Sequence, residues 1–319
     1  VFGDWSSDVC SSDLAPDERN AVQGKLAAIG GFGRILGAAI GAMLYDGLRL
    51  MYPGWGFRSG AIFFTAAGVM FVSAIPLLFM PEGGLASSPA GAALAGEGAA
   101  GAATVGAAAE GTREASPPRP GALRSFAIFL GAMLLINSGV NSVGAFRGQF
   151  MDLAEGFAAP ASAIALASNV ESAAVIAFGL LAGLLGRRLG VRRLLAAGAA
   201  AGLCSLAMHA AAPGLGWVLA AAALKGAADA SVGASSYAFA AALIPPERRG
   251  RWFAYYNATF FLSWGVSATF VTGPLIDALM GAGTGAVAAY RAGFVSAALL
   301  VALGLGLLWG LLASTSSGR

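Results

Sequence analysis

Long apolar stretches dominate this chain and limit what it can fold into. Eight stretches are long enough, at about 20 residues or more, to cross a hydrocarbon core: 26–48, 59–80, 125–146, 161–186, 194–212, 216–243, 252–276 and 292–313. Of the 319 residues, 57% are hydrophobic and 11% charged, whereas a soluble domain carries about a quarter charged residues. Only helices and closed barrels satisfy the backbone in lipid, so the stretches predict an all-α, polytopic helical bundle.

The scarcity of reactive side chains argues against several classes of protein. One His (His209) and two Cys (Cys10 and Cys204) are too few for a zinc cluster or a disulfide framework. The basic residues form no run on a polar face, and no hydrolase or metalloprotease motif is present. We therefore expect no enzyme activity, no cofactor, no metal and no nucleic-acid partner. We expect His209 near a membrane interface and Cys204 as a small packing residue.

Two segments differ in character from the apolar stretches. Residues 4–14 read D-W-S-S-D-V-C-S-S-D-L, which resembles the translation of a sequencing-library adapter, so we treat residues 1–14 as an artefact. Residues 81–123 are rich in Gly, Ala, Ser and Pro without periodicity, which is typical of a flexible linker. The remaining parts are 15–80, with two predicted spans, and 124–319, with six.

The distribution of basic residues predicts the orientation in the membrane. If the end near residue 15 is cytoplasmic, four basic residues fall on the opposite face: Arg49, Arg58, Arg147 and Arg291. The cytoplasmic side then holds thirteen: Arg19, Lys25, Arg113, Arg119, Arg124, Arg187, Arg188, Arg192, Arg193, Arg248, Arg249, Arg251 and Arg319. By the positive-inside rule, both ends and the linker are cytoplasmic.

An internal repeat relates the first two predicted spans to the last two. Three pairs of motifs recur: P-D-E-R (Pro16–Arg19) with P-P-E-R (Pro245–Arg248), Y-D-G-L (Tyr45–Leu48) with I-D-A-L (Ile276–Leu279), and F-R-S-G (Phe57–Gly60) with Y-R-A-G (Tyr290–Gly293). Both copies enter the membrane from the Arg-rich side, which indicates a parallel repeat about the membrane normal. The repeat predicts that the first copy is incomplete and lacks four spans.

Two six-helix halves joined by a long cytoplasmic linker resemble the major facilitator superfamily of secondary transporters. The resemblance implies that residues 15–319 are helices five to twelve of an expected twelve, with eight present. A second match is G-L-L-G-R-R-L-G-V-R-R, which is similar to the cytoplasmic G-x-L-x-D-R-x-G-R-R loop of that family. It implies a latch loop containing Gly183, Arg187, Arg188, Gly190, Arg192 and Arg193.

The departures from the family pattern leave two points open. Arg187 stands where the family has its Asp, so the four Arg of this loop can equally be topology determinants only. The stretch 33–42 is similar to the Gly-rich fifth helix of exporters, with Ala38 in place of Pro, which weakens the case for a drug:proton antiporter.

Ionisable residues within membrane spans are costly, and each is a candidate for function. Glu171 lies about ten residues into the stretch 161–186 and can take up and release a proton as access alternates; a structural Glu, either protonated or paired with an Arg, is the alternative. Lys225 and Asp229 lie four residues apart, so they can neutralise each other on one helix face. Glu171 and then Asp229 are our candidates for proton coupling.

The remaining polar residues in the spans are candidates for a substrate cavity. They are Arg34, Asn137, Asn141, Asn169, Lys225 and Asn257. Arg34 can bind an anionic group of the substrate or pair with an acid elsewhere, and Asn137 and Asn141 can bind substrate or join helices by hydrogen bonds.

These residues predict a secondary active transporter that moves a small solute by alternating access, with protons as the coupling ion. The alternative is a scaffold or sensor that kept the helical bundle but does not transport. The bilayer and a small-molecule substrate are the expected partners of a monomeric protein in a bacterial inner membrane.

Overall fold

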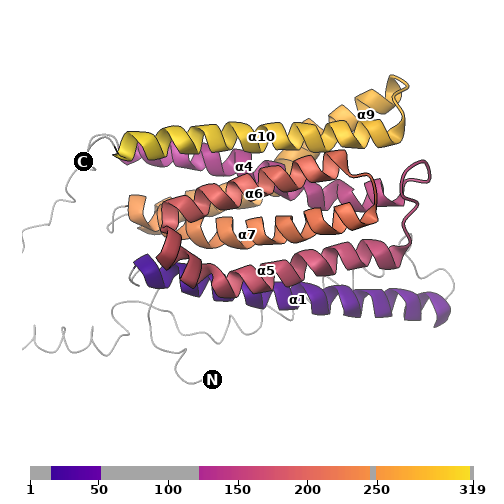
Figure 1. Ribbon diagram of the computed structural model, residues 1–319, viewed down its shortest axis with the longest axis horizontal. Coiled ribbons are helices and arrows are strands. Elements are labelled where there is room, and N and C mark those ends of the chain that lie inside the picture. Colours follow the sequence, from indigo (N-terminus) through magenta and orange to yellow (C-terminus); the bar gives the residue numbers. More distant parts are fainter. Residues whose placement is uncertain (1–15, 52–121, 245–248, 317–319) are drawn as a thin grey trace, which may run out of the picture. The chain divides into compact units, whose positions relative to one another are not determined.

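Every described element is a helix. The computed structural model describes residues 16–51, 122–244 and 249–316, and these ranges contain no β-strand. The elements are α1 (Pro16–Met51), α4 (Ala122–Asp152), α5 (Ala161–Leu189), α6 (Val191–Ala211), α7 (Leu215–Leu243), α8 (Arg249–Val266), the π-helical turn η3 (Ser267–Thr272), α9 (Gly273–Gly281) and α10 (Ala286–Ser316), as Figure 1 shows.

Six of the described helical segments are long and apolar enough to cross a membrane. They are α4, α5, α6, α7, the continuous segment α8–η3–α9, and α10, which correspond to the third to eighth predicted spans. The chain is therefore a multi-pass helical membrane protein. The first predicted span lies within α1, whereas 59–80, most of the linker and residues 1–14 lie outside the described residues. The count of eight spans stays a prediction.

The chain divides into two compact units. One comprises residues 15–35 and 118–319, and all interactions discussed below lie within it. The other comprises residues 1–14 and 36–117, of which the structure describes only the continuation of α1 to Met51. The second part of the larger unit starts at residue 118, before the predicted end of the linker at residue 123. Ala122 and Leu123 of the predicted linker already belong to α4.

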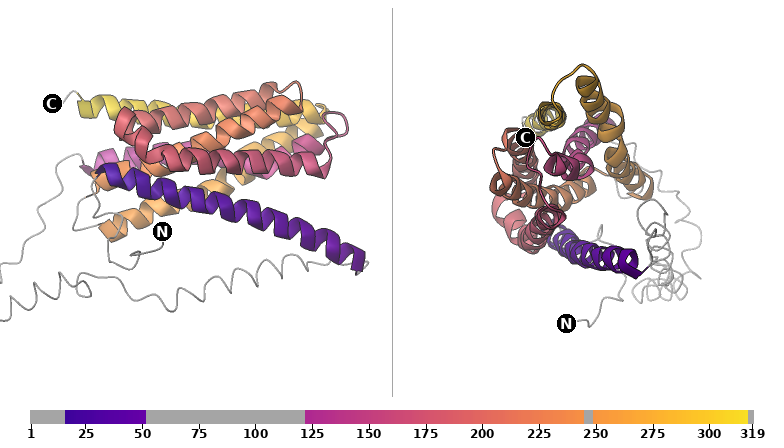
Figure 2. Two further views of the ribbon diagram at one scale, coloured as in Figure 1. Left: turned by 60° about the horizontal axis from the view of Figure 1, so that its bottom comes forward. Right: turned by 90° about the vertical axis from the view of Figure 1, so that its right-hand side faces the viewer.

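Within the larger unit, α4 and α7 have helices packed on several sides. α4 packs along α10 and α8, while α7 lies between α5 and α6 (Figures 1 and 2). The core between α4 and α10 contains Phe129, Met133, Ile136 and Phe294, all fully buried. Dispersion contacts between such side chains hold helices together in lipid, where the hydrophobic effect gives no net attraction.

Large apolar side chains also point outward from the bundle. Phe270 is 74% exposed, Phe261 73% and Trp309 67%, whereas Glu171 and Lys225 are buried. In water this arrangement would be unfavourable, because apolar surface is exposed while charge is desolvated. In a bilayer the outward face meets lipid, so the arrangement agrees with the membrane assignment.

The segment α8–η3–α9 changes its helical winding at η3. The π-helical turn ends at Thr272, and Gly273 separates it from Pro274; a proline in a helix cannot donate to the carbonyl one turn earlier. The Thr272 hydroxyl donates to the Ser267 carbonyl at 2.9 Å, which satisfies a carbonyl within the widened turn. Such single π turns are common at functional sites.

The segment predicted as a latch loop is helical except at one residue, and its role as a latch stays a prediction. α5 continues to Leu189 and α6 begins at Val191, so Gly190 alone joins the two helices. Gly190 has a φ of 80°, a left-handed conformation that favours glycine and reverses the chain within one residue. Arg187 and Arg188 lie in the last turn of α5, where positive charge is favourable because the helix C-terminus carries partial negative charge.

Candidate functional site

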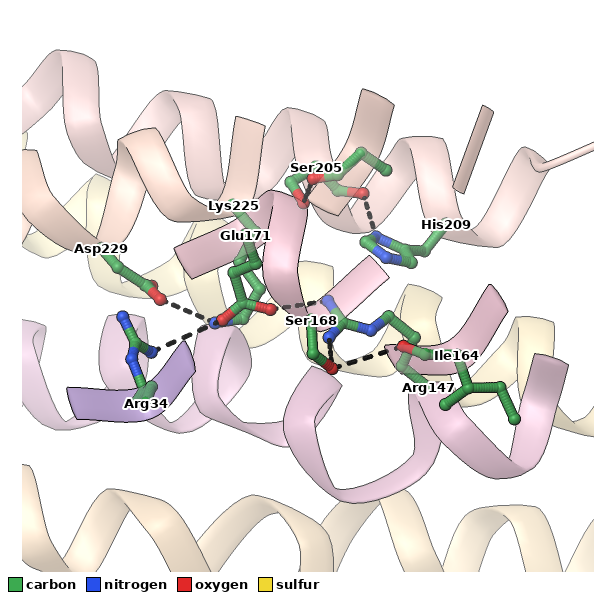
Figure 3. A network of polar contacts seen from close by, with 10 residues as sticks. Arg34, Arg147, Ile164, Ser168, Glu171, Ser205, His209, Lys225 and Asp229 are labelled. Carbon is green, nitrogen blue, oxygen red and sulfur yellow. Dashed lines mark hydrogen bonds and ion pairs between the residues drawn. The ribbon is translucent and has the colours of Figure 1, made fainter. Parts of the chain in front are cut away.

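Glu171 lies at the centre of a buried ionic cluster formed by four helices (Figure 3). Its Oε2 accepts a hydrogen bond from Arg147 Nη1 at 2.6 Å, and its Oε1 accepts one from Lys225 Nζ at 2.9 Å. Lys225 Nζ also donates to Asp229 Oδ2 at 2.7 Å. Charge-assisted bonds of this length are stronger than neutral ones, and here they link α4, α5 and α7.

Small residues let the helices that carry this cluster approach closely. Gly226 follows Lys225 on α7, and a Cβ on Gly226 would overlap the Glu171 carbonyl and the Ala174 side chain of α5.

Ser168 precedes Glu171 by three residues on α5, and its hydroxyl accepts a hydrogen bond from Arg147 Nη2 at 3.1 Å. Two groups of α5 therefore orient the guanidinium of Arg147.

Arg34 of α1 approaches the same carboxylate less closely. Its Nη1 lies 3.8 Å from Glu171 Oε1, which already accepts from Lys225. The side chain of Arg34 is 46% exposed, against 7% for Arg147 and 6% for Lys225. Because an exposed pair at this distance contributes little to stability, Arg34 is the member of the cluster with free donor capacity.

Our placement of Arg147 on the outer face was wrong. Arg147 is buried within α4, which extends to Asp152, and it binds Glu171 from the next helix. We ended the predicted span at residue 146 because the apolar stretch ends there. The neighbouring candidate Glu171 was the available signal, since a buried carboxylate needs a cation and Arg147 lies near the same end of the preceding helix.

A cavity of about 460 Å³ lies beside the ionic cluster. Five of the predicted site residues line it: Arg34, Asn137, Asn141, Asp229 and Asn257. The sequence reasoning missed other lining residues, which are polar or aromatic: Gln23, Ser236, Tyr237, Tyr256, Phe260 and Trp264. The volume is within the range of sites for small organic molecules, which is about 300–1,000 Å³.

Hydrogen bonds between helices fix the polar wall of this cavity. Asn141 Nδ2 on α4 donates to Ser263 Oγ on α8 at 2.9 Å. On the α7 side, the hydroxyls of Ser236 and Tyr256 lie 2.7 Å apart and share a hydrogen bond. Asn141 thus has the interhelical bond that we considered as an alternative to substrate binding, and it also lines the cavity.

The other predicted site residues lie away from the cavity surface. Glu171 and Lys225 are buried behind it and do not line it, although Asp229 and Arg34 connect them to it. Asn169 is exposed on another face of α5, because a separation of two residues turns a side chain by more than half of a helical turn. The pairing of Lys225 with Asp229, expected from their spacing, is confirmed at 2.7 Å.

The four latch residues Arg187, Arg188, Arg192 and Arg193 are exposed at the junction of α5 and α6. Within the described part of the chain, none of them forms an ion pair. This position agrees with topology determinants as well as with a latch.

Cys204 does not lie where we expected it, whereas His209 lies in the last turn of α6 and its position at a membrane interface stays a prediction. His209 is fully buried; its Nδ1 lies 2.8 Å from the Ser205 carbonyl, its ring stacks on Phe294, and its Nε2 has no partner among the described residues. α6 turns His209 inward because the ring packs with the aromatic core. Cys204 is exposed on the outer face of α6 rather than packed.

Two further expectations remain open. The repeat between the first and last pairs of spans depends on Arg58 and Arg248, which lie outside the described residues. Among the described residues, no group of three His, Cys, Asp or Glu side chains gathers closely enough to hold a metal ion.

Comparison of the chain with protein-family profiles, with curated proteins and with solved structures finds no match.

Proposed function

We propose that this protein is a secondary active transporter of the major facilitator type, which moves a small solute by alternating access and is coupled to protons. The observation that carries the proposal is a buried ionic cluster of two carboxylates and three cations beside a cavity in an apolar helical bundle. Charge within a bilayer is costly, and ionisable residues in membrane spans are therefore rare and often mark the pathway of a solute or of protons.

The two carboxylates differ in their access to the cavity. Asp229 lines it, and its side chain is 23% exposed. The side chain of Glu171 is 11% exposed and is held by Arg147 and Lys225. We therefore assign proton exchange to Asp229, and to Glu171 the role of counter-charge to the two buried cations.

The basic residues also indicate how the bundle is oriented in the membrane. The exposed arginines at the α5–α6 junction favour the cytoplasmic side for that end of the bundle. A bacterial inner membrane, with the central linker in the cytoplasm, is the proposed location.

Solute accumulation driven by an imposed pH gradient tests this function. The full-length protein in proteoliposomes should concentrate at least one labelled solute from a panel of organic anions, amines, amino acids and sugars. Asp229→Asn should abolish accumulation but retain exchange of that solute, because the amide keeps the shape and hydrogen bonding of Asp229 and cannot ionise.

Asp277→Asn is the matched control, since Asp277 is an exposed carboxylate on α9 and does not line the cavity. It should accumulate solute as the unaltered protein does. Binding of a solute in the cavity without any flux would contradict transport and favour a sensor. Accumulation by Asp229→Asn would remove Asp229 from the coupling mechanism.

A further inference from the structure

The ionic cluster beside the cavity carries an excess of positive charge. Arg34, Arg147 and Lys225 face Glu171 and Asp229, which gives a formal charge of +1 from three cations and two carboxylates. Each buried cation has a carboxylate oxygen within 2.9 Å, while Arg34 has one at 3.8 Å. The excess charge therefore resides on Arg34.

Arg34 also points the excess charge at the cavity. It lines the cavity with its side chain 46% exposed, and its planar guanidinium offers five N–H donors. The Glu171 oxygen nearest to it already accepts from Lys225, and within the described residues Arg34 forms no other ion pair. An arginine with unused donors at a cavity wall fits a planar or tetrahedral anion, which it can bind with two parallel hydrogen bonds.

The rest of the lining fits a ligand that is not wholly polar. Phe260, Trp264 and Tyr256 of α8 contribute aromatic surface, and Asn137 and Asn257 contribute amides that carry no charge. In the described lining, Asp229 is the one carboxylate, and it is bound to Lys225. The lining therefore has aromatic surface for an apolar body and a single unneutralised cation for an anionic group.

We propose that this cavity binds a small organic anion with an aromatic or apolar body, and that Arg34 binds its anionic group. The proposal rests on the proposed function, of which it specifies the substrate class. The sequence alone is compatible with either a ligand or an acidic partner for Arg34, and its exposure at the cavity wall favours the ligand.

Three probes of similar shape and different charge test this proposal. They are benzenesulfonate, benzenesulfonamide and benzyltrimethylammonium, and their affinities for the purified full-length protein are measured by calorimetric titration. Benzenesulfonate stays ionised at all working pH values, so its charge is constant. We expect it to bind about tenfold or more tightly than benzenesulfonamide, and the cation to bind more weakly than both.

Variants of α1 identify the residue responsible. Arg34→Gln should weaken benzenesulfonate binding by about tenfold, and Arg34→Lys by less, because the lysine keeps the charge but not the two parallel bonds. Lys25→Gln is the control: it removes a positive charge from the same helix at an exposed position outside the cavity lining, and should change affinity less than twofold. Arg34 is half exposed and weakly paired, so neither Arg34 variant should impair folding.

Three results would each overturn the proposal. They are equal affinities for the sulfonate and the sulfonamide, an Arg34→Gln variant that binds as the unaltered protein does, and no binding of benzenesulfonate at millimolar concentration. Failure of the proposed function is a separate outcome, because it would leave charge-selective binding intact and abolish flux. Conversely, proton-driven accumulation of a cation or a neutral solute, together with unselective binding of the probes, would retain transport and refute the anion site.

Discussion

Glu171 accepts hydrogen bonds from two buried cations, which makes the bundle sensitive to the loss of any one partner. Ionisable residues within membrane spans are candidates for function. This rule is enough to predict Glu171, Lys225, Asp229 and Arg34 as site residues. It missed Arg147, because the end of an apolar stretch is not the end of a helix. It also could not distinguish Asn169 from Asn141, since the facing of a helix depends on its neighbours.

At the residue scale, the bond between Arg147 and Glu171 should be strongly coupled. Arg147→Gln alone leaves Glu171 with one hydrogen-bonded cation, Lys225, besides the more distant Arg34, and should lower the free energy of unfolding by about 3–5 kcal/mol. The variant Arg147→Gln/Glu171→Gln should lose less than the sum of the two single variants, because no charge of the pair is left unpaired. Thermal unfolding in detergent of all four proteins measures this coupling, and additive losses would show that the two side chains act independently.

At the element scale, the approach of α5 to α7 depends on a position that lacks a side chain. Gly226 faces the backbone of Glu171, so the close approach at this glycine accompanies the bond between Lys225 and Glu171. The helices could be predicted from the apolar stretches, and six of them agree with membrane spans. The single-residue junction at Gly190 and the π turn before Pro274 could not, because they arise from packing of the completed helices.

Gly226→Ala should therefore separate α5 from α7 and lower the free energy of unfolding by about 1–3 kcal/mol, the usual cost of overpacking. Gly216→Ala is the matched control on α7, since a Cβ there meets open space, and the higher helix propensity of Ala should leave stability equal or up to about 1 kcal/mol higher. Unfolding midpoints in detergent distinguish the two variants. Equal midpoints would mean that α5 and α7 can readily shift apart.

At the scale of the whole molecule, the orientation of the bundle relates the cavity to the two compartments. α5 ends and α6 begins at the end that carries Arg188, whereas the turn between α9 and α10, with Ala282, lies at the other end of the bundle (Figure 1). By the positive-inside rule, we expect the Arg188 end on the cytoplasmic side.

Cysteine labelling checks this orientation. In a background without Cys10 and Cys204, Arg188→Cys should react with a membrane-impermeant maleimide in inverted vesicles and not in intact cells. Ala282→Cys should show the opposite behaviour, since both side chains are exposed and lie at opposite ends of the bundle. Labelling of Arg188→Cys in intact cells would reverse the orientation.

Anion binding and proton binding should be coupled, because both depend on the charge of the ionic cluster. Protonation of Asp229 would raise the formal charge of the five side chains from +1 to +2, so that a bound proton favours a bound anion and, by reciprocity, an anion favours the proton. The most direct measurement is the internal pH of proteoliposomes that enclose a pH-sensitive dye, after an inward gradient of benzenesulfonate is imposed without a pH gradient. We expect acidification of the interior by the unaltered protein, and none in Asp229→Asn or protein-free liposomes. Entry of benzenesulfonate with no change in internal pH would contradict this coupling.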